Sequence, residues 1–322
     1  MPWSPASPGT RTAQTGERLQ ESTMSPSTPA STPASPPASP LLRFTKHHGA
    51  GNDFLVLIRP GLSGPLPGEL VRALCDRRFG VGADGVIQIV DGGGVADVGM
   101  VLQNADGREA EMSGNGMRCL AQAAVLSALV NPPRFTVATA AGIKAVEYIE
   151  GPHIHVAQAS VDLGAAVLGP DQPQKFLDRK VRTVNMGNPH LVMFGPDLDD
   201  VDVAGIGASL QDVYEGGINV EFIASGEAPD NLHLRVYERG VGETQACGTG
   251  SAAAAAAARS WGLVGDKVSV HNPGGVLEVT LDGDDARLRG PVHRIASVVV
   301  DTDALLDGAR PLVTTSVTSA QR

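Results

Sequence analysis

Two short segments of the sequence carry the residue types that a paired proton-transfer site needs. Met112-Ser113-Gly114-Asn115-Gly116 and Ala246-Cys247-Gly248-Thr249-Gly250 each place a hydroxyl or a thiol before a Gly-x-Gly turn that opens a small-residue helix. A helix N-terminus presents unpaired N–H groups and a positive potential. We therefore expect the amides of these two turns to hold a substrate carboxylate, and the second helix to lower the pKa of the Cys247 thiol.

The two segments belong to a repeat that extends through both halves of the chain. Ser113 and Cys247 lie 134 residues apart, and Asn104 and Glu238 lie nine residues before them. Further echoes, 135 or 136 residues apart, pair Gly51-Asn52 with Gly187-Asn188, Gly82 with Gly217, and Asp84 with Asn219. A duplicated half is expected to face its twin across one pocket, with one proton-handling group on each side.

Each motif also has an interpretation without chemistry. A single serine before Gly-Asn-Gly is most often an N-cap, and a single cysteine such as Cys247 is more often structural. Their duplication at matching positions favours the functional interpretation of Ser113 and Cys247. Glu238 and Arg239 are adjacent in a turn before the second helix, where they could bind an ammonium and a carboxylate or form an exposed ion pair.

The surrounding elements are mainly strands. From Leu41 onward, short apolar runs alternate with glycine-rich turns, which is the pattern of strands. An amphipathic helix is expected over Glu69–Arg78, ending at Gly80. Small uncharged residues predict two enclosed helices, from Asn115 to about Val130 and from Thr249 to about Trp261. Strands on both sides of each helix indicate a sheet wrapped around a central helix, twice.

Composition limits the classes of partner and compartment. Residues 1–40 are mostly Ser, Pro, Thr and Ala, and we expect a disordered tail. A net charge of −10 without a basic stripe and an aromatic content of 4% argue against nucleic acid as the partner. No run of about 18 apolar residues exists, so no membrane span is predicted. Three cysteines suit a reducing compartment, which favours the cytoplasm.

Two other patterns do not predict a cofactor or a metal. Gly80-Val81-Gly82-Ala83-Asp84-Gly85 matches G-x-G-x-x-G, but it follows a helix and leads into a strand, the reverse of a dinucleotide site. We interpret these glycines as a tight turn. His153 and His155 share one face of a predicted strand with no third ligand nearby, so no metal site is expected.

With these residues assembled, the chain from about Phe44 to Asp301 resembles the diaminopimelate epimerase family. The matching segments are His48-Gly49-Ala50-Gly51-Asn52-Asp53-Phe54, Gly80-Val81-Gly82-Ala83-Asp84-Gly85, Asn104-Ala105-Asp106-Gly107, Gly114-Asn115-Gly116, Gly187-Asn188-Pro189-His190, Asn219, Tyr237-Glu238-Arg239-Gly240 and Ala246-Cys247-Gly248-Thr249-Gly250. Together they are far more specific than any one of them.

The resemblance implies an α+β fold of two pseudo-symmetric domains, each a mostly antiparallel β-barrel around a central helix, with the active site between them and a homodimer as the assembly. On this chain the first domain would cover 41–162 with a returning strand at about 294–305, and the second 163–293, followed by a flexible tail at 306–322. No cofactor is implied.

The resemblance also assigns roles to individual positions. Cys247, Ser113, His190 and Glu238 would be catalytic. Asn52, Asn104, Asn188 and Asn219 would bind the distal end of the substrate or line the cleft. Gly114, Asn115, Gly248 and Thr249 would cradle the reacting carboxylate. Glu238 and Arg239 would hold the substrate and order the site.

Ser113 departs from the family pattern, which uses two cysteines as a base and acid pair on opposite faces of the α-carbon. A serine hydroxyl gives essentially no alkoxide near neutral pH, so Ser113 is a poor base by itself. Cys119 does not replace it, because six residues along a helix correspond to about 9 Å of rise and over half a turn of rotation. Ser113 could still donate a proton or act through a neighbouring base or water.

The resemblance implies a cofactor-independent epimerase that interconverts LL- and meso-2,6-diaminopimelate, a reaction of lysine and peptidoglycan precursor synthesis. The partner is then a small amino acid rather than nucleic acid or membrane. Two alternatives stay open. One is a racemase, epimerase or dehydratase of another amino acid on the same scaffold. The other is a catalytically silent amino-acid-binding protein, which Ser113 supports and Cys247, Glu238 and His190 oppose.

Overall fold

The computed structural model describes residues 41–59, 61, 64–172 and 179–309. The predicted tail at 1–40 lies outside these residues, as does most of the predicted C-terminal tail. The helices are α1 (Gly68–Cys75), α2 (Gly114–Leu126), α3 (Val203–Leu210), α4 (Gly248–Ser260) and α5 (Thr302–Ala309). Among them, none combines the length and the apolar character needed to cross a bilayer.

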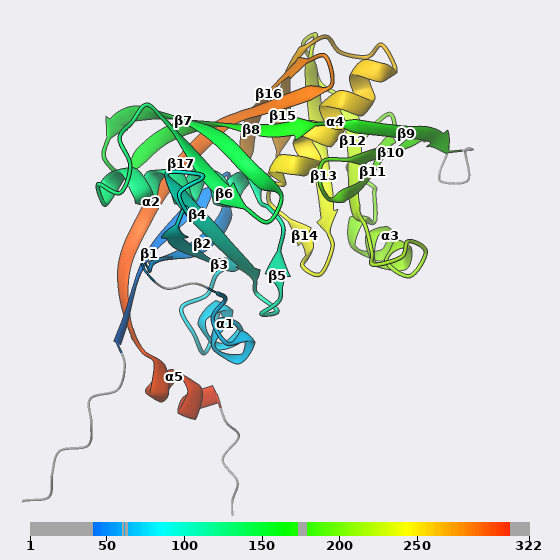
Figure 1. The fold of residues 1–322 in the computed structure, drawn as a ribbon. Helices are drawn as coiled ribbons and strands as arrows, with labels where there is room; N and C mark the ends of the chain where they lie inside the picture. The colour runs from blue at the N-terminus through cyan, green and yellow to red at the C-terminus, as the bar shows by residue number, and fades with distance from the viewer. Residues whose placement is uncertain (1–40, 60, 62–63, 173–178, 310–322) are drawn as a thin grey trace, which may run out of the picture. The chain divides into compact units, whose positions relative to one another are not determined.

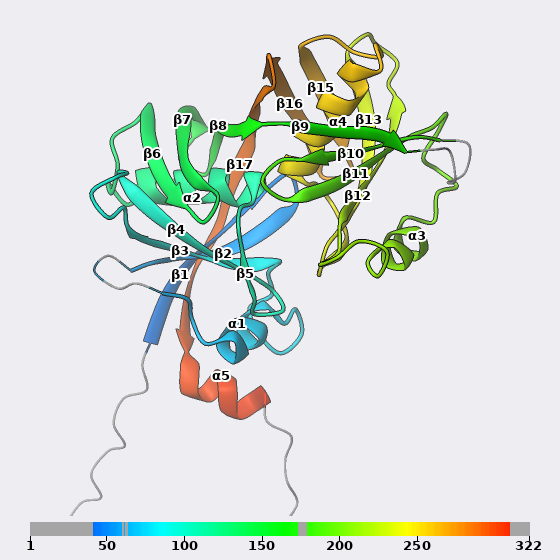
Figure 2. The same cartoon turned by 45° about the vertical axis from the view of Figure 1, so that its right-hand side comes forward.

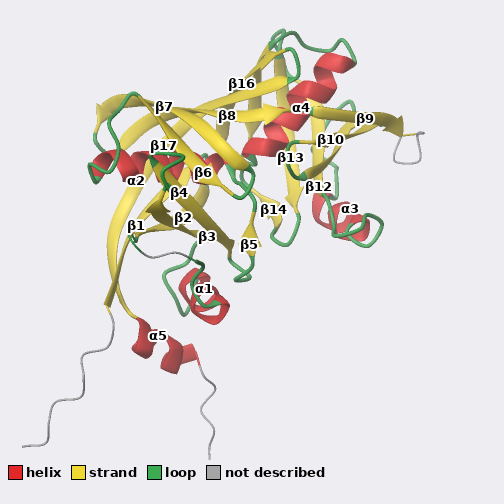
Figure 3. Cartoon of the chain, in the orientation of Figure 1, coloured by secondary structure: helices red, strands yellow, loops and turns green. Residues whose placement is uncertain are grey.

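Strands are more extensive than helices in the described chain (Figures 1 and 3). In the first half they are β1 (Leu41–Gly49), β2 (Asn52–Ile58), β3 (Gly85–Asp91), β4 (Val98–Asn104), β5 (Glu109–Ala110), β6 (Arg134–Thr139), β7 (Gly142–His153) and β8 (Val156–Ala165). In the second half they are β9 (Val167–Gln172), β10 (Lys180–Asn185), β11 (Pro189–Phe194), β12 (Asn219–Ser225), β13 (Asn231–Glu238), β14 (Gly242–Thr244), β15 (Lys267–Asn272), β16 (Gly275–Asp282) and β17 (Asp285–Asp301).

The first-half strands close into a ring around α2. In order, β17, β1, β2, β3, β4, β6, β7 and β8 are hydrogen-bonded neighbours, and β8 pairs with β17 again. Only the β2–β3 and β4–β6 pairs are parallel. Residues 114–124 of α2 are all buried, because the strands enclose the helix on every side.

The second half repeats this arrangement around α4. The pairs β9–β10, β10–β11, β12–β13, β15–β16 and β16–β17 are antiparallel, and β11–β12 and β13–β15 are parallel at the matching places. Residues 248–258 of α4 are buried. The predicted fold class, two mostly antiparallel barrels each around a central helix, is therefore confirmed.

The β8–β9 connection and the long strand β17 join the two halves. β8 and β9 are separated by Ala166 alone, and β17 pairs with β16 and β8 near its start and with β1 near its end. Figure 2 shows β8 continuing into β9 from the region of α2 to the region of α4. Because these strands serve both barrels, the exact boundaries 41–162 and 163–293 stay a prediction.

Three predicted element ends differ in the structure. The helix expected to reach Arg78 ends at Cys75, because Asp76 is extended and its carboxylate accepts from the Arg78 and Phe79 amides at 2.7 Å. The helix expected to reach Val130 ends at Leu126, before Ala128 at φ +53°. The predicted returning strand at about 294–305 ends at Asp301, and residues 302–305 belong to α5 together with 306–309, which were predicted as the start of a flexible tail.

Candidate active site

The N-termini of the two enclosed helices touch each other. A Cβ atom added to Gly114 would lie 3.1 Å from the Cα of Gly248, and one added to Gly248 would lie 2.8 Å from the Cα of Gly114. Glycine is required on both sides, because the two backbones leave no room for a side chain. The barrels are thus joined at the point where both helices present their unpaired N–H groups.

Ser113 and Cys247 are the N-caps of α2 and α4. The Oγ of Ser113 accepts from the Gly116 amide at 3.0 Å, and the Sγ of Cys247 accepts from the Gly250 amide at 3.3 Å. Both residues are in extended backbone conformation, as N-caps usually are. The repeat therefore gives the hydroxyl and the thiol the same local geometry.

Both N-caps line one cavity of about 260 Å³ at this junction. It also contains the other predicted site residues with one exception, His190. The predicted residues that line it are Asn52, Asn104, Ser113, Gly114, Asn115, Asn188, Asn219, Glu238, Arg239, Cys247, Gly248 and Thr249. Residues from both barrels therefore face one shared space, as the repeat predicted.

The strand ends explain why these polar residues meet. Asn52 begins β2 and Asn104 ends β4, while Asn219 begins β12 and Glu238 ends β13. In each barrel these two strand ends line the same cavity as the N-cap of the enclosed helix. The matching order of strands thus delivers an amide or a carboxylate to the cavity from each side.

The environment of Cys247 contradicts the expected activation of its thiol. Burial raises the pKa of Cys247 well above its usual value, and the Glu238 and Glu221 carboxylates raise it further. The Thr249 hydroxyl and the Gly250 amide act in the opposite direction but do not prevail. The predicted lowering of the Cys247 pKa by the helix N-terminus was wrong, because burial and two nearby carboxylates outweigh the helix.

Glu238 lies beside this thiol and is itself hard to ionise. Burial raises the pKa of Glu238 to about 7, although hydrogen bonds from Thr244 and Cys247 favour its charged form. The Thr244 hydroxyl donates to Glu238 Oε1 at 2.5 Å. The Glu238 carboxylate, which accepts a hydrogen bond from the thiol, is thus placed to exchange a proton with it, although the higher pKa of Cys247 keeps the proton on sulfur at rest.

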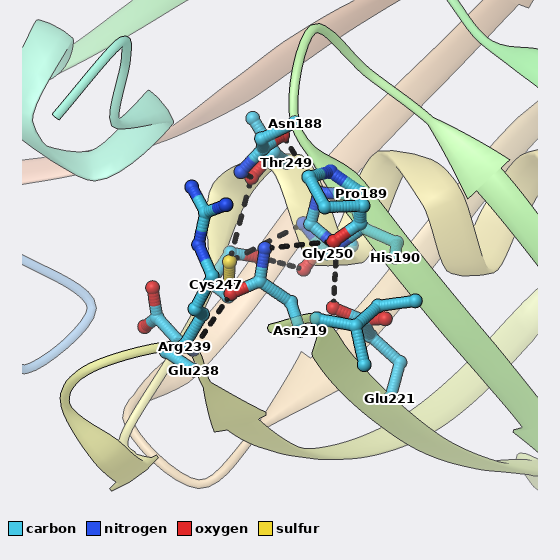
Figure 4. A network of polar contacts seen from close by, with 12 residues as sticks. Asn188, Pro189, His190, Asn219, Glu221, Glu238, Arg239, Cys247, Thr249 and Gly250 are labelled. Atoms are coloured by element: carbon cyan, nitrogen blue, oxygen red, sulfur yellow. Dashed lines mark hydrogen bonds and ion pairs between the residues drawn. The ribbon is translucent and has the colours of Figure 1, made fainter. Parts of the chain in front are cut away.

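His190 lies behind the residues that line the cavity, and its catalytic role stays a prediction. Its ring is fully buried, with Nδ1 2.6 Å from Glu221 Oε1 and Nε2 2.8 Å from Asn188 Oδ1. Asn188 in turn donates to Thr249 Oγ1 at 3.5 Å (Figure 4). His190 thus contacts the cavity through Asn188, which lines it.

Glu221 was missed by sequence reasoning. It lies fully buried on β12, and its Oε1 would be only 2.6 Å from a Cβ atom on Gly250. The signal was present, because Glu221 interrupts an otherwise apolar strand, Val220 to Ala224. A buried carboxylate usually has a specific charged or hydrogen-bonding partner. Here the partner is His190.

A second polar network supports the α2 side. The Asn115 amide donates to the Ala246 carbonyl at 2.7 Å and to Asn52 Oδ1 at 3.2 Å. Asn52 donates to Asp84 Oδ2 at 2.8 Å. Asp84, which the repeat pairs with Asn219 but which was not among the predicted site residues, therefore lines the cavity and orients Asn52. Asn115 reaches across the junction to the residue before Cys247.

Arg239 is held at the rim of the cavity by both barrels. Its amide donates to Asn219 Oδ1 at 2.9 Å, and its guanidinium lies 3.4 Å from a carboxylate oxygen of Glu111. Glu111 precedes Ser113 by two residues and was not singled out from the sequence. An exposed pair of this kind is weak, so a substrate carboxylate can compete with Glu111 for Arg239.

The described residues offer no metal site, since no three His, Cys, Asp or Glu side chains among them are grouped to hold an ion. The G-x-G-x-x-G segment ends where β3 begins, at Gly85. Its geometry is that of a turn, with Gly82 at φ +79°. The chemical groups of the cavity thus include one thiol, the Ser113 and Thr249 hydroxyls, the Arg108 and Arg239 guanidinium groups, carboxylates, amides and two helix N-termini.

Comparisons with known proteins agree with the pattern of residues. The family model described as diaminopimelate epimerase matches residues 44–168 and 182–295. A diaminopimelate epimerase of Desulforapulum autotrophicum is 39% identical over 277 residues, which are 79% of this chain and 97% of that protein. One of Desulforudis audaxviator is 41% identical over 271 residues, 78% of this chain and 94% of that protein.

Solved structures share the fold at lower identity. A hydroxyproline epimerase from Agrobacterium vitis with bound trans-4-hydroxy-L-proline has a TM-score of 0.67 and 16% identity, covering 85% of this chain and 96% of its own. A Bacillus anthracis protein of the PhzF family of phenazine biosynthesis has a TM-score of 0.64 and 15% identity, covering 81% of this chain and 99% of its own. At these identities the likeness shows the two-barrel fold alone.

Proposed function

This chain belongs to the diaminopimelate epimerase family of isomerases, and we propose that it interconverts LL- and meso-2,6-diaminopimelate by proton transfer on two faces of one α-carbon, without a cofactor. The observation that carries the proposal is the shared cavity into which Ser113 and Cys247 are brought by two touching helix N-termini. We assign the reaction to lysine and peptidoglycan precursor synthesis.

In this proposal the helix N-termini bind the reacting carboxylate. Removal of the α-proton places negative charge on that carboxylate, where the amides around Gly114, Asn115, Gly248 and Thr249 can donate to it. Donors that are already aimed at developing charge are worth about 100- to 1,000-fold in rate. Arg239, with the asparagines of the cavity, would hold the distal end of the substrate.

Cys247 and Glu238 supply the base. Glu238 takes the Sγ proton of Cys247, and the thiolate then removes the α-proton, so that the C–H bond breaks and an S–H bond forms. The raised pKa of Cys247 works in favour of this step, because a thiolate of high pKa is a stronger base. The same raised pKa makes the proton transfer to Glu238 necessary beforehand.

Ser113 acts on the opposite face. Its hydroxyl, or a water bound to it, gives a proton to the carbanion, and solvent then replaces that proton. Ser113 is poor in the reverse role, because its hydroxyl does not ionise near neutral pH. The two faces should therefore work at different rates.

The test is incubation of the purified protein with LL-diaminopimelate in deuterium oxide, following meso product and α-deuterium together. We expect both, with label entering the substrate faster than product forms. Cys247→Ala should abolish label uptake, whereas Ser113→Ala should retain label uptake and lose product. Persistent exchange in Cys247→Ala would show that the base is misassigned.

The same measurement separates the alternatives. Neither label nor product from diaminopimelate, with binding retained, would favour a silent amino-acid-binding protein, for which Ser113 is the specific observation. Exchange into another amino acid alone would favour a different substrate on this scaffold. We also propose a homodimer in the cytoplasm, which light scattering after size-exclusion chromatography and fractionation of cells would test.

A further inference from the structure

Arg118 is a buried cation near the N-terminus of α2, and it takes no part in the proposed proton transfers. Arg118 is completely buried, and its guanidinium makes three contacts. Nη2 donates to Asn115 Oδ1 at 2.6 Å, Nη1 to the Gly114 carbonyl at 3.2 Å, and Nε to the Pro291 carbonyl of β17 at 3.2 Å. It therefore ties the first turn of α2 to the strand that both barrels share.

The protein makes room for this group. A Cβ atom on Gly49 of β1 would lie 2.8 Å from Nη2 of Arg118, and one on Gly290 of β17 would lie 3.2 Å from its Cζ. Glycines on two strands thus leave the space that the guanidinium fills.

The charge of Arg118 is not balanced by a carboxylate. Its three acceptors within the described chain are one side-chain amide and two carbonyl oxygens. Burial lowers the pKa of Arg118 to about 10, which leaves it positive at neutral pH. An unpaired buried cation is costly, and it is retained where an anion or a fixed orientation requires it.

The contacts lead from Arg118 to the catalytic thiol. By occupying Asn115 Oδ1, Arg118 fixes the amide group of Asn115 so that its Nδ2 points to the Ala246 carbonyl at 2.7 Å. Ala246 precedes Cys247. A free asparagine amide could turn over and lose this contact, whereas the guanidinium allows one orientation only.

We propose that Arg118 is a positioning residue, which holds Asn115 as a clamp between the two helix N-termini and so fixes Cys247 relative to Ser113 and to the substrate carboxylate. This inference rests on the proposed function and deepens it. The repeat supports a dedicated role, because the residue 134 positions later is Ala252, so only α2 of the two helices carries an arginine at this place.

The kinetic test compares Arg118→Met, Arg118→Lys and Asn115→Ala with a matched control, Gln122→Leu. Gln122 is equally buried one turn further along α2, where it contacts His47 and not the cavity. We expect Arg118→Met to lower kcat about 10- to 100-fold with KM changed less than about threefold. Arg118→Lys should recover part of kcat, and Gln122→Leu should keep the turnover of the unmodified protein.

A double variant tests the clamp directly. If Arg118 acts through Asn115, Arg118→Met combined with Asn115→Ala should be no slower than the slower single variant. The proposal would be overturned if the fold-losses of kcat in the two single variants multiplied in the double variant. It would also be overturned by an unchanged kcat in Arg118→Met, or by equal losses of kcat in Arg118→Met and Gln122→Leu.

A second readout does not depend on the substrate. The rate at which iodoacetamide alkylates Cys247, followed by mass spectrometry of its peptide, should be roughly threefold higher in Arg118→Met and Asn115→Ala, because release of Ala246 loosens the N-cap. Gln122→Leu should match the unmodified protein. Equal rates in all variants would refute the clamp, even if the protein proved to have no epimerase activity.

Discussion

Ser113 and Cys247 show that equal geometry does not give equal chemistry. Each caps a helix through the amide three residues later, at 3.0 Å and 3.3 Å. Only the thiol has a partner that can take its proton, because Glu238 accepts a hydrogen bond from Cys247. The Oγ of Ser113 has the Gly116 amide as its hydrogen-bond partner among the described residues. The two faces of the cavity are therefore chemically unequal.

Ser113→Cys should raise the rate of epimerisation. A thiol at this N-cap ionises far more readily than a hydroxyl and can serve as base or acid, so we expect a gain of about 10- to 100-fold in kcat. Meso product formed from LL-diaminopimelate is the measurement. Ser127→Cys, at the opposite end of α2, is the control and should change nothing. An unchanged rate in Ser113→Cys would mean that proton return at this face does not limit turnover.

Thr244→Val should shift the pH dependence of activity to higher pH. The Thr244 hydroxyl lowers the pKa of Glu238, which burial raises to about 7. In the proposed mechanism Glu238 can accept a proton only when it is ionised. Activity should therefore rise with pH through about 7, and removal of the hydroxyl should move the midpoint of kcat/KM upward. Thr136→Val, which removes a distant hydroxyl bonded to Asp97, should leave the midpoint in place. A fixed or lowered midpoint would exclude Glu238 as the acceptor.

At the scale of elements, the site depends on two helices that touch end to end. A methyl group at Gly114 would meet Leu288 Cδ2 at 2.9 Å and the Cα of Gly248 at 3.1 Å. The backbone of α4 cannot yield as a flexible side chain would. Gly114 and Gly248 are thus needed for close approach, whatever their conformational freedom.

Gly114→Ala should separate the two helix N-termini and lower activity more than stability. Overpacking at this contact should cost about 1–3 kcal/mol of unfolding free energy. A displacement of the N-caps by a fraction of an ångström to 1 Å should lower kcat about 100-fold. Turnover and urea unfolding are the two measurements. Gly308→Ala in α5 has open space around the added methyl group and serves as the control. Full turnover in Gly114→Ala would contradict the required contact.

The sequence predicts the helices of the site better than the ends and partners of its elements. The caps and small residues at Ser113 and Cys247 locate α2 and α4 within one residue at their starts, because the signal is local. The end of α1 depends on the Asp76 carboxylate turning back onto two amides. The burial of His190 against Glu221 depends on the pairing of β11 with β12, which residue spacing does not reveal.

At the scale of the whole described chain, two barrels share strands and a core. β17 is paired with β1 of one barrel and β16 of the other, and one continuous hydrophobic cluster includes residues packed around both α2 and α4. Neither barrel can open at this junction without disturbing the other. The site is therefore fixed by the packing of both halves, and a buried charge change in one barrel should destabilise the whole.

Acid should destabilise the protein through His47, which lies completely buried in the first barrel against Gln122 and Thr45. Burial lowers the pKa of His47 from 6.5 to about 4, with the charges of Arg294 and His48 acting in the same direction. The unfolded chain therefore protonates His47 more readily than the folded protein does. The free energy of unfolding is thus fully retained above pH 6.5 and falls as the pH drops toward 4. Between pH 7 and pH 4 the loss should be about 3 kcal/mol greater than in His47→Gln, measured by urea unfolding. Equal losses in both proteins would show that His47 is already charged in the folded state.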